Sequence, residues 1–266
     1  VKRLQVVIAN NEKNGRDTFV AVSGGSQPSI LSQSFLQSTI NWDTVHFFFT
    51  DERFVKLTHP DSNFEAWNRL FFILLTRLFS SSVGTIAPDH IHPIDENAKT
   101  VQEAASLYPP SSPLMDRYTK DLAIVPKRNG IPAFDVLLLG MGPDGHTCSL
   151  FPGRKQLLED KEFVTFIEDS PKPPSQRITL TFPVVNNASS VFFVITGKDK
   201  EPCIREIREG HSTVPSSRVV PTSGDCVWFV DPAAAGQSRV CSHMVGGHSE
   251  WHSMNTKRIS TTGRMH

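Results

Sequence analysis

Apolar residues in this chain fall in short runs that have the length of β-strands. The clearest runs are Thr18–Val22, Val45–Phe49, Val136–Leu139, Val191–Ile195 and Val227–Val230. Continuous apolar runs of this length are typical of strands that are buried on both faces, as in a parallel sheet. Longer mixed segments separate them and predict helices over residues 1–9, 28–37, 64–79, 97–107, 113–124 and about 201–209. This alternation predicts an α/β fold with a mostly parallel sheet and helices on both faces.

The pattern continues without a break to about residue 235. No linker rich in Pro, Gly or Ser divides the apolar segments before that point, so we predict a single domain over residues 1–235. Residues 236–266 are polar, basic and aperiodic, and we expect a flexible tail there. The chain begins with Val1 rather than methionine, which indicates that residues before it are missing.

Composition narrows the classes of partner. The 266 residues carry 27 Lys and Arg against 27 Asp and Glu, and this balance argues against nucleic acid or an anionic membrane as a partner. The longest apolar run, Leu70–Leu75, is too short to cross a bilayer, and no signal peptide is visible. We therefore expect a soluble, cytoplasmic protein. The sequence leaves its oligomeric state open, a monomer included.

The most specific stretch of the chain is Phe134–Pro152, which reads FDVLLLGMGPDGHTCSLFP. Its apolar strand ends in a loop with three glycines within six residues, so neither helix nor strand can continue through it. Asp144 and His146 lie in that loop, and both can hold or orient a proton. Because ligands of open α/β sheets bind in the crevice outside the carboxyl ends of the strands, we predict that these two residues belong to an active site.

Three other loops also follow predicted strands and carry polar groups. The turn after the first strand contains Gly24, Gly25 and Ser26. It precedes a helix, so its backbone N–H groups and the helix N-terminus could bind phosphate. Arg53 closes a charged triplet after the second strand, and Lys198 follows a glycine after the fourth strand, with Lys200 as a weaker candidate.

A proline-rich segment contributes two further cations. Residues 170–181 read SPKPPSQRITLT, and the prolines force an extended chain that fixes the places of Lys172 and Arg177. Each of these loops, taken alone, also has an ordinary explanation as a strand–helix turn or as surface charge.

Two sets of histidines and cysteines could suggest metal binding, and we favour neither. His90 and His92 form an HxH pair in a predicted short strand over residues 90–94, but no further ligand is suitably spaced. The tail contains one cysteine and three histidines whose spacing fits no standard zinc finger, namely Cys241, His243, His248 and His252.

Four of these stretches together resemble the 6-phosphogluconolactonases, in the wider family of glucosamine-6-phosphate isomerases and deaminases. They are SGGS at 23–26, TDER at 50–53 with DSN at 61–63, GMGPDGHTCSLFP at 140–152 and SPKPPSQRITLT at 170–181. All are placed in loops after predicted strands or beside them, which is the context that such matches require. The resemblance covers about residues 17–235 and implies a Rossmann-like doubly wound domain.

The resemblance also implies an activity and a set of site residues. The activity is hydrolysis of 6-phospho-D-glucono-1,5-lactone to 6-phosphogluconate, a step of the oxidative pentose phosphate pathway that needs no metal or organic cofactor. His146 would be the general base that activates water, and Asp144 would orient its imidazole. The sugar phosphate would be bound by the remaining candidates, namely Gly24, Gly25, Ser26, Arg53, Lys172, Arg177 and Lys198.

Two other functions stay open. A glucosamine-6-phosphate deaminase of the same family would have an aromatic residue at Arg53 and a GHIAFNEP-like run where this chain has HTCSLFP. A non-catalytic sugar-phosphate-binding protein would keep the phosphate loops and lack the base, whereas His146 is present. The chain has no GxSxG motif to support a serine nucleophile, and we interpret Cys148 as a packed thiol.

Overall fold

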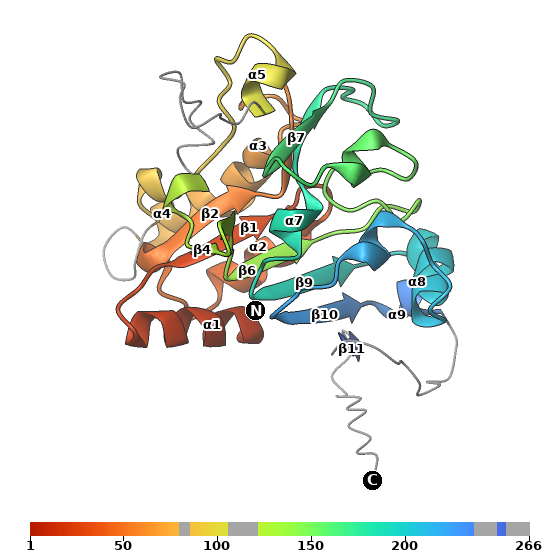
Figure 1. Cartoon of the computed structure of the whole chain (residues 1–266). Helices are drawn as coiled ribbons and strands as arrows, with labels where there is room; N and C mark the ends of the chain where they lie inside the picture. Colours follow the sequence, from red (N-terminus) through yellow and green to blue (C-terminus); the bar gives the residue numbers. More distant parts are fainter. Residues whose placement is uncertain (80–85, 106–121, 237–248, 254–266) are drawn as a thin grey trace.

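A six-stranded, wholly parallel sheet forms the centre of the protein. The computed structural model describes residues 1–79, 86–105, 122–236 and 249–253. The strand order is β11–β10–β9–β6–β1–β2 (Figure 1). The strands are β1 Thr18–Val22, β2 Val45–Phe49, β6 Val136–Leu139, β9 Ser190–Ile195, β10 Asp225–Val230 and β11 Ser249–Ser253. Because the order runs outward from β1 in both directions, the sheet is doubly wound, and the predicted fold class is confirmed.

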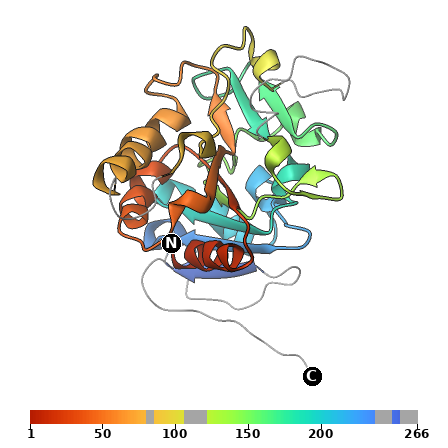
Figure 2. The same cartoon turned by 90° about the vertical axis from the view of Figure 1, so that its left-hand side faces the viewer.

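Alternate residues of each strand pack against helices on opposite faces of the sheet. In β1, Val20 and Val22 belong to one core cluster, and Phe19 and Ala21 belong to the other. The first face is covered by α1 Lys2–Lys13, α2 Gln27–Leu36, α3 Asn63–Trp67 and α4 Ile73–Phe79. The second face is covered by α5 Val101–Ala105, α7 Phe182–Val185, α8 Glu201–Arg208 and α9 Pro232–Ala235. Figure 2 shows α3 and α4, in orange, gathered to one side of the sheet.

The apolar segment over residues 64–79 is helical throughout but not a regular α-helix. A π-helical turn, Asn68–Phe72, joins α3 to α4. Trp67, the last residue of α3, and Phe71, within the π-helical turn, are both fully buried. The Trp67 indole N–H donates to the carbonyl of Ser23 at 2.8 Å, so this helix holds the loop after β1.

A small antiparallel sheet lies beside the large one, toward the top of Figure 1. It consists of β3 Asp51–Arg53, β8 Arg177–Leu180 and β7 Val164–Ile167. The pairing of β3 with β8 sets Arg53 opposite Arg177. Two segments that lie more than a hundred residues apart in the chain therefore bring their arginines together. A two-stranded hairpin, β4 Lys127–Arg128 with β5 Ile131–Pro132, precedes β6.

Short 3₁₀ turns occupy several connections between these elements. They are η1 Trp42–Thr44, η3 Pro88–His90, η4 Lys155–Leu158, η5 Lys198–Lys200 and η6 Pro215–Arg218. Residues 90–94, predicted as a short strand, form a single bridge between Ile91 and Phe47 instead. Pro93 lies within this segment and Pro88 precedes it, and both limit its pairing. The helix predicted over 113–124 lies mostly outside the described residues.

The tail predicted from residue 236 is described only at Ser249–Ser253, where it forms strand β11. This strand extends the sheet by pairing in parallel with β10. The run Val227–Val230, which belongs to β10, is therefore followed by one more strand. The sequence of β11 has no strand-like apolar pattern. Pairing at an open sheet edge uses backbone groups, so it does not require such a pattern. Within the described parts of the chain, no helix is both long and apolar enough to span a membrane.

Candidate active site

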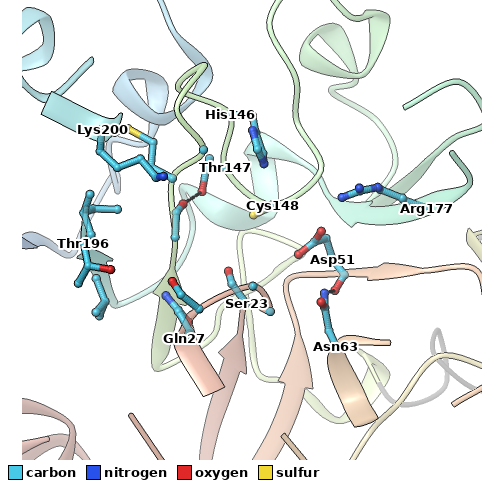
Figure 3. Close-up of a pocket in the computed structure, with 18 of the residues that line it drawn as sticks. Ser23, Gln27, Asp51, Asn63, His146, Thr147, Cys148, Arg177, Thr196 and Lys200 are labelled. Atoms are coloured by element: carbon cyan, nitrogen blue, oxygen red, sulfur yellow. Dashed lines mark hydrogen bonds between the residues drawn. The ribbon is translucent and has the colours of Figure 1, made fainter. Parts of the chain in front are cut away.

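A pocket of about 330 Å³ opens at the carboxyl ends of the parallel strands. The loops after β1, β2, β6 and β9 all reach it, as expected for a doubly wound sheet. Figure 3 shows His146 on one wall, Arg177 with Asp51 on a second, and Thr196 with Lys200 on a third. The lining residues are Ser23, Gly24, Gly25, Ser26, Gln27, Asp51, Arg53, Asn63, Gly140, Met141, Gly142, His146, Thr147, Cys148, Arg177, Val194, Ile195, Thr196 and Lys200.

The Nδ1 side of the His146 ring contacts a carboxylate, which in turn contacts an ammonium group. His146 Nδ1 lies 2.6 Å from Asp144 Oδ1, and Lys172 Nζ lies 3.2 Å from the same oxygen. Gly142 permits this approach, because a Cβ there would lie 2.1 Å from the imidazole. The Gly142 N–H also donates to the His146 carbonyl at 2.9 Å, which closes the loop on itself. The predicted His146–Asp144 pair is therefore formed, although neither Asp144 nor Lys172 lines the pocket.

The charge on Asp144 determines which imidazole nitrogen carries the proton. Burial opposes ionisation of this carboxyl, but the hydrogen bond and charge of His146 and the charge of Lys172 outweigh it. Together they hold the pKa of Asp144 well below its ordinary value. An ionised carboxylate can only accept, so when the imidazole of His146 is neutral its Nδ1 is the donor and its Nε2 keeps the lone pair. His146 can thus accept a proton from a group in the pocket.

The two arginines form a cationic wall. Arg177 is only 3% exposed, and its guanidinium donates to three backbone carbonyls of residues 172–174 at 2.9–3.0 Å. Arg53 donates through Nη1 to the carbonyl of Asp61 at 2.8 Å, and its buried Nε has no partner among the described residues. Like charges directly opposite each other destabilise a sheet. Two arginines paired across strands on one pocket wall therefore indicate a site for an anion, and Arg177 also positions the loop that carries Lys172.

The two lysines after β9 lie in different surroundings. Lys198 has a 72% exposed side chain, pairs with Glu201 at 3.4 Å and does not line the pocket. Lys200 has a 17% exposed side chain, contacts the carboxylate of Asp199 and lines the pocket. The 3₁₀ turn η5 explains the difference, because it rotates the chain by about 120° per residue and so separates side chains two positions apart. The structure brings the weaker of the two sequence candidates to the pocket.

The glycine turn after β1 packs closely against Asn63. A Cβ on Gly24 would lie 1.7 Å from Asn63 Oδ1, and Gly25 has a φ of +64° that favours glycine. Asn63 Nδ2 donates to the Asp51 carbonyl at 2.8 Å, while its Oδ1 has no partner among the described residues. The predicted turn of Gly24, Gly25 and Ser26 therefore forms one side of the pocket, at the N-terminus of α2.

Glu52, between the pocket residues Asp51 and Arg53, has a structural role. It is fully buried and its carboxylate accepts from the backbone N–H groups of Arg53, Asn63 and Phe64 at 2.7–2.8 Å. A fourth donor is the Ser62 hydroxyl at 3.1 Å. Glu52 thus caps the N-terminus of α3 and ties β3 to it.

We expect Glu52→Gln to remove a pH dependence of stability. Burial raises the pKa of Glu52 from 4.5 to about 7, although the three N–H donors oppose the shift. The folded protein then holds this proton more tightly than the unfolded chain does. Its contribution is present below pH 4.5 and is lost as the pH rises through about 7. A shift of this size corresponds to about 3 kcal/mol.

Urea unfolding between pH 4 and pH 8 measures this effect as a difference between the parent and the variant. The parent should lose stability relative to Glu52→Gln as the pH rises. Asp61→Asn, a neighbouring carboxylate whose side chain is 55% exposed, should track the parent and serves as the control. Parallel curves for the parent and Glu52→Gln would contradict the raised pKa.

The cysteine and histidine candidates have ordinary surroundings in the described residues. Cys148 lines the pocket, but burial raises the pKa of its thiol far above the ordinary value, so it is not a thiolate at neutral pH. His90 and His92 pack around His46, with ring centroids 3.9 Å and 5.3 Å from it. No group of three or more His, Cys, Asp or Glu side chains in the described chain could hold a metal ion. In the tail, Cys241, His243 and His248 lie outside the described residues, and His252 belongs to β11, where it is paired with Phe229.

Several lining residues were not assigned by the sequence analysis. Asp51 and Asn63 lie within the stretches TDER and DSN, so their signal was present but unused. Asp51 accepts from the Ser149 hydroxyl at 2.7 Å. Gln27 and Thr196 directly follow a motif stretch and a strand, and their residue types alone carry no signal. Only the convergence of four strand ends places them in the pocket.

Comparison with known proteins agrees with this geometry. The family model for glucosamine-6-phosphate isomerases/6-phosphogluconolactonase matches residues 1–228. The curated 6-phosphogluconolactonase 3, chloroplastic, of Arabidopsis thaliana is 38% identical over 221 residues, which are 82% of this chain and 64% of that protein. The 6-phosphogluconolactonase of Rattus norvegicus is 38% identical over 222 residues, 81% of this chain and 79% of the rat protein. The chain thus spans somewhat less than two thirds of the Arabidopsis relative.

A solved structure shows the same fold. The 6-phosphogluconolactonase of Thermotoga maritima superposes with a TM-score of 0.68 at 27% identity, covering 86% of this chain and 92% of that one. The strand order and the pocket at the strand ends agree with these matches. The chain therefore belongs to the family of glucosamine-6-phosphate isomerases and 6-phosphogluconolactonases.

Proposed function

We propose that this protein hydrolyses 6-phospho-D-glucono-1,5-lactone to 6-phosphogluconate. Family membership and the names of its relatives support a lactonase. The single observation that carries the mechanism is the His146–Asp144 pair, which leaves a basic imidazole nitrogen at a pocket whose other walls carry cations. A basic nitrogen suits the hydrolysis of an ester, and the cations suit an anionic group attached to that ester.

In this mechanism His146 acts first as a base and then as an acid. Its Nε2 takes a proton from water as the water oxygen bonds to the lactone carbonyl carbon. The bond from that carbon to the ring oxygen then breaks, and the imidazolium returns the proton to the ring oxygen. The product is the open-chain acid, which ionises in water. Asp144 holds the ring in one tautomer and stabilises its charged form, and Lys172 keeps Asp144 ionised.

The phosphate of the substrate would bind where backbone donors and cations meet. The turn of Gly24, Gly25 and Ser26 stands at the N-terminus of α2, a ten-residue helix. Arg53, Arg177 and Lys200 line the same pocket. Charge-assisted hydrogen bonds from such groups contribute about 1.5–3 kcal/mol each. Lys198 is not included, because its side chain is exposed and paired elsewhere.

Incubation with two sugar phosphates tests the proposal. The purified chain should release acid from 6-phosphogluconolactone well above the spontaneous opening of the lactone, which is measured in parallel and subtracted. It should release no ammonia from glucosamine 6-phosphate. Ammonia release would identify a deaminase, and binding of 6-phosphogluconate without turnover of the lactone would identify a non-catalytic binding protein.

Location and assembly stay predictions from the sequence. We expect a cytoplasmic lactonase, although one plant relative is named as chloroplastic, and the oligomeric state stays open, a monomer included. Size-exclusion chromatography with light scattering measures the oligomeric state directly.

A further inference from the structure

Gln27 is the one lining residue whose whole side-chain polar group is buried without a partner in the described structure. It is the first residue of α2 and is 1% exposed. Neither its Oε1 nor its Nε2 has a hydrogen-bond partner among the described residues, yet the residue lines the pocket. Its backbone N–H is occupied by the Gly24 carbonyl at 3.3 Å, so only the amide group of the side chain is unpaired.

A buried amide without partners destabilises a fold, since its hydrogen bonds to water are lost and not replaced. A residue with a purely structural role would be expected to use at least one of its two polar atoms within the protein. The hydroxyl of Ser23, which lies beside Gln27 in Figure 3, is already engaged, because it lies 2.8 Å from the Thr50 hydroxyl. The unpaired amide therefore indicates a group that binds a ligand.

The chemistry of an amide specifies what that ligand group can be. Nε2 donates and Oε1 accepts, so the matching partner must also accept and donate. A hydroxyl does both, whereas a fully ionised phosphate oxygen can only accept and would leave Oε1 unpaired. In Figure 3, Gln27 lies beside Ser23, away from the wall that carries Arg177 and Asp51. This separates the amide of Gln27 from Arg177, one of the cations suited to the phosphate.

We propose that the side-chain amide of Gln27 binds a hydroxyl of the sugar-acid chain and so selects for a polyhydroxylated substrate. This inference rests on the proposed lactonase function and adds to it a residue that determines specificity. A site that hydrogen-bonds a substrate hydroxyl rejects an analogue lacking it, because the buried polar groups are then left unpaired. Selectivity among sugar phosphates would therefore depend on Gln27 rather than on the phosphate-binding cations.

The test compares Gln27→Met with Gln33→Met, which removes an exposed amide from the same helix. Calorimetry gives the affinities for 6-phosphogluconate, for its monodeoxy analogues and for inorganic phosphate. Gln27→Met should bind 6-phosphogluconate about 10-fold more weakly, while inorganic phosphate binding changes less than about 2-fold. The parent should bind one deoxy analogue about 10-fold more weakly than 6-phosphogluconate, and Gln27→Met should not distinguish the two. Gln33→Met should match the parent.

The melting temperature supplies a second readout. If Gln27 had a structural role, its replacement would lower the melting temperature, whereas a ligand-binding role predicts no fall. Without ligand, Gln27→Met should melt at the same temperature as the parent or higher, because an unpaired buried amide has been replaced by an apolar side chain of similar size. Gln27→Ala repeats the binding measurement with a side chain too short to clash.

Each contrary outcome has a distinct meaning. Parent-like affinity of both variants for 6-phosphogluconate would show that Gln27 does not touch the ligand. An equal loss of inorganic phosphate binding would make it a phosphate contact, and a clear fall in melting temperature would make it structural. Any of these overturns the inference and leaves the lactonase proposal intact. A parent that neither hydrolyses the lactone nor binds 6-phosphogluconate would instead overturn the proposed function.

Discussion

His146→Ala should reduce turnover of 6-phosphogluconolactone by ~10²–10⁴-fold, the usual contribution of a positioned general base. The substitution removes the nitrogen that accepts the proton of the attacking water. It leaves the cations Arg53, Arg177 and Lys200 in place on the other walls of the pocket. Affinity for 6-phosphogluconate should therefore stay close to that of the parent. Initial rates, corrected for spontaneous lactone opening, and calorimetry of product binding measure the two effects separately.

Cys148→Ala is the matched control, because Cys148 lies two residues along the same loop and also lines the pocket. Its buried thiol has a pKa far above the ordinary value, so the proposed reaction makes no use of it. The control should retain nearly all of its activity. Full activity in His146→Ala together with its abolition in Cys148→Ala would reject the general-base mechanism and indicate a cysteine nucleophile.

Lys200→Ala should raise the Michaelis constant for the lactone by about 10- to 100-fold, with a smaller effect on kcat. The reason is the loss of one charge-assisted contact to the phosphate, which contributes about 1.5–3 kcal/mol. Lys200 lines the pocket from a different wall than Arg177 (Figure 3), so the loss of its ammonium group leaves Arg177 in place. Steady-state kinetics over a wide substrate range measures the Michaelis constant and kcat independently.

Lys198→Ala is the control for charge, since it removes the same group two residues away. The exposed Lys198 ammonium pairs with Glu201 outside the pocket, so its loss should change the Michaelis constant by less than about 2-fold. A large effect of Lys198→Ala with none of Lys200→Ala would restore the assignment made from the sequence. It would also show that the turn η5 rearranges when substrate binds.

Most strands of the parallel sheet were predictable because their signal is local. The runs Thr18–Val22 and Val45–Phe49 are apolar at every position or nearly so, and both are strands of the parallel sheet with the bounds that the pattern indicates. Among the described strands of the parallel sheet, the addition to the predicted ones is β11, which the sequence could not reveal. An edge strand is selected by backbone pairing with β10, and backbone groups are the same in every residue.

The loop that carries the proposed base was also predictable, for a local reason. Asp144 and His146 are two residues apart, and Gly142 allows them to meet because no Cβ separates them. Short-range chemistry of this kind is visible in the order of residues. The charge state of Asp144 was not, since it depends on Lys172, which reaches the carboxylate from a separate loop.

The sequence by itself thus determined the fold class, the strand ends that form the pocket, and the His146–Asp144 pair. Only the tertiary structure decided which side chains enter that pocket. It brought Lys200 in rather than Lys198, engaged Arg177 with the backbone of residues 172–174, and buried the amide of Gln27 without a partner. The physical reason is that these facts depend on the direction of each side chain and on neighbours contributed by distant segments. Local patterns fix where a strand ends, and packing among four strand ends fixes what lies around the ligand.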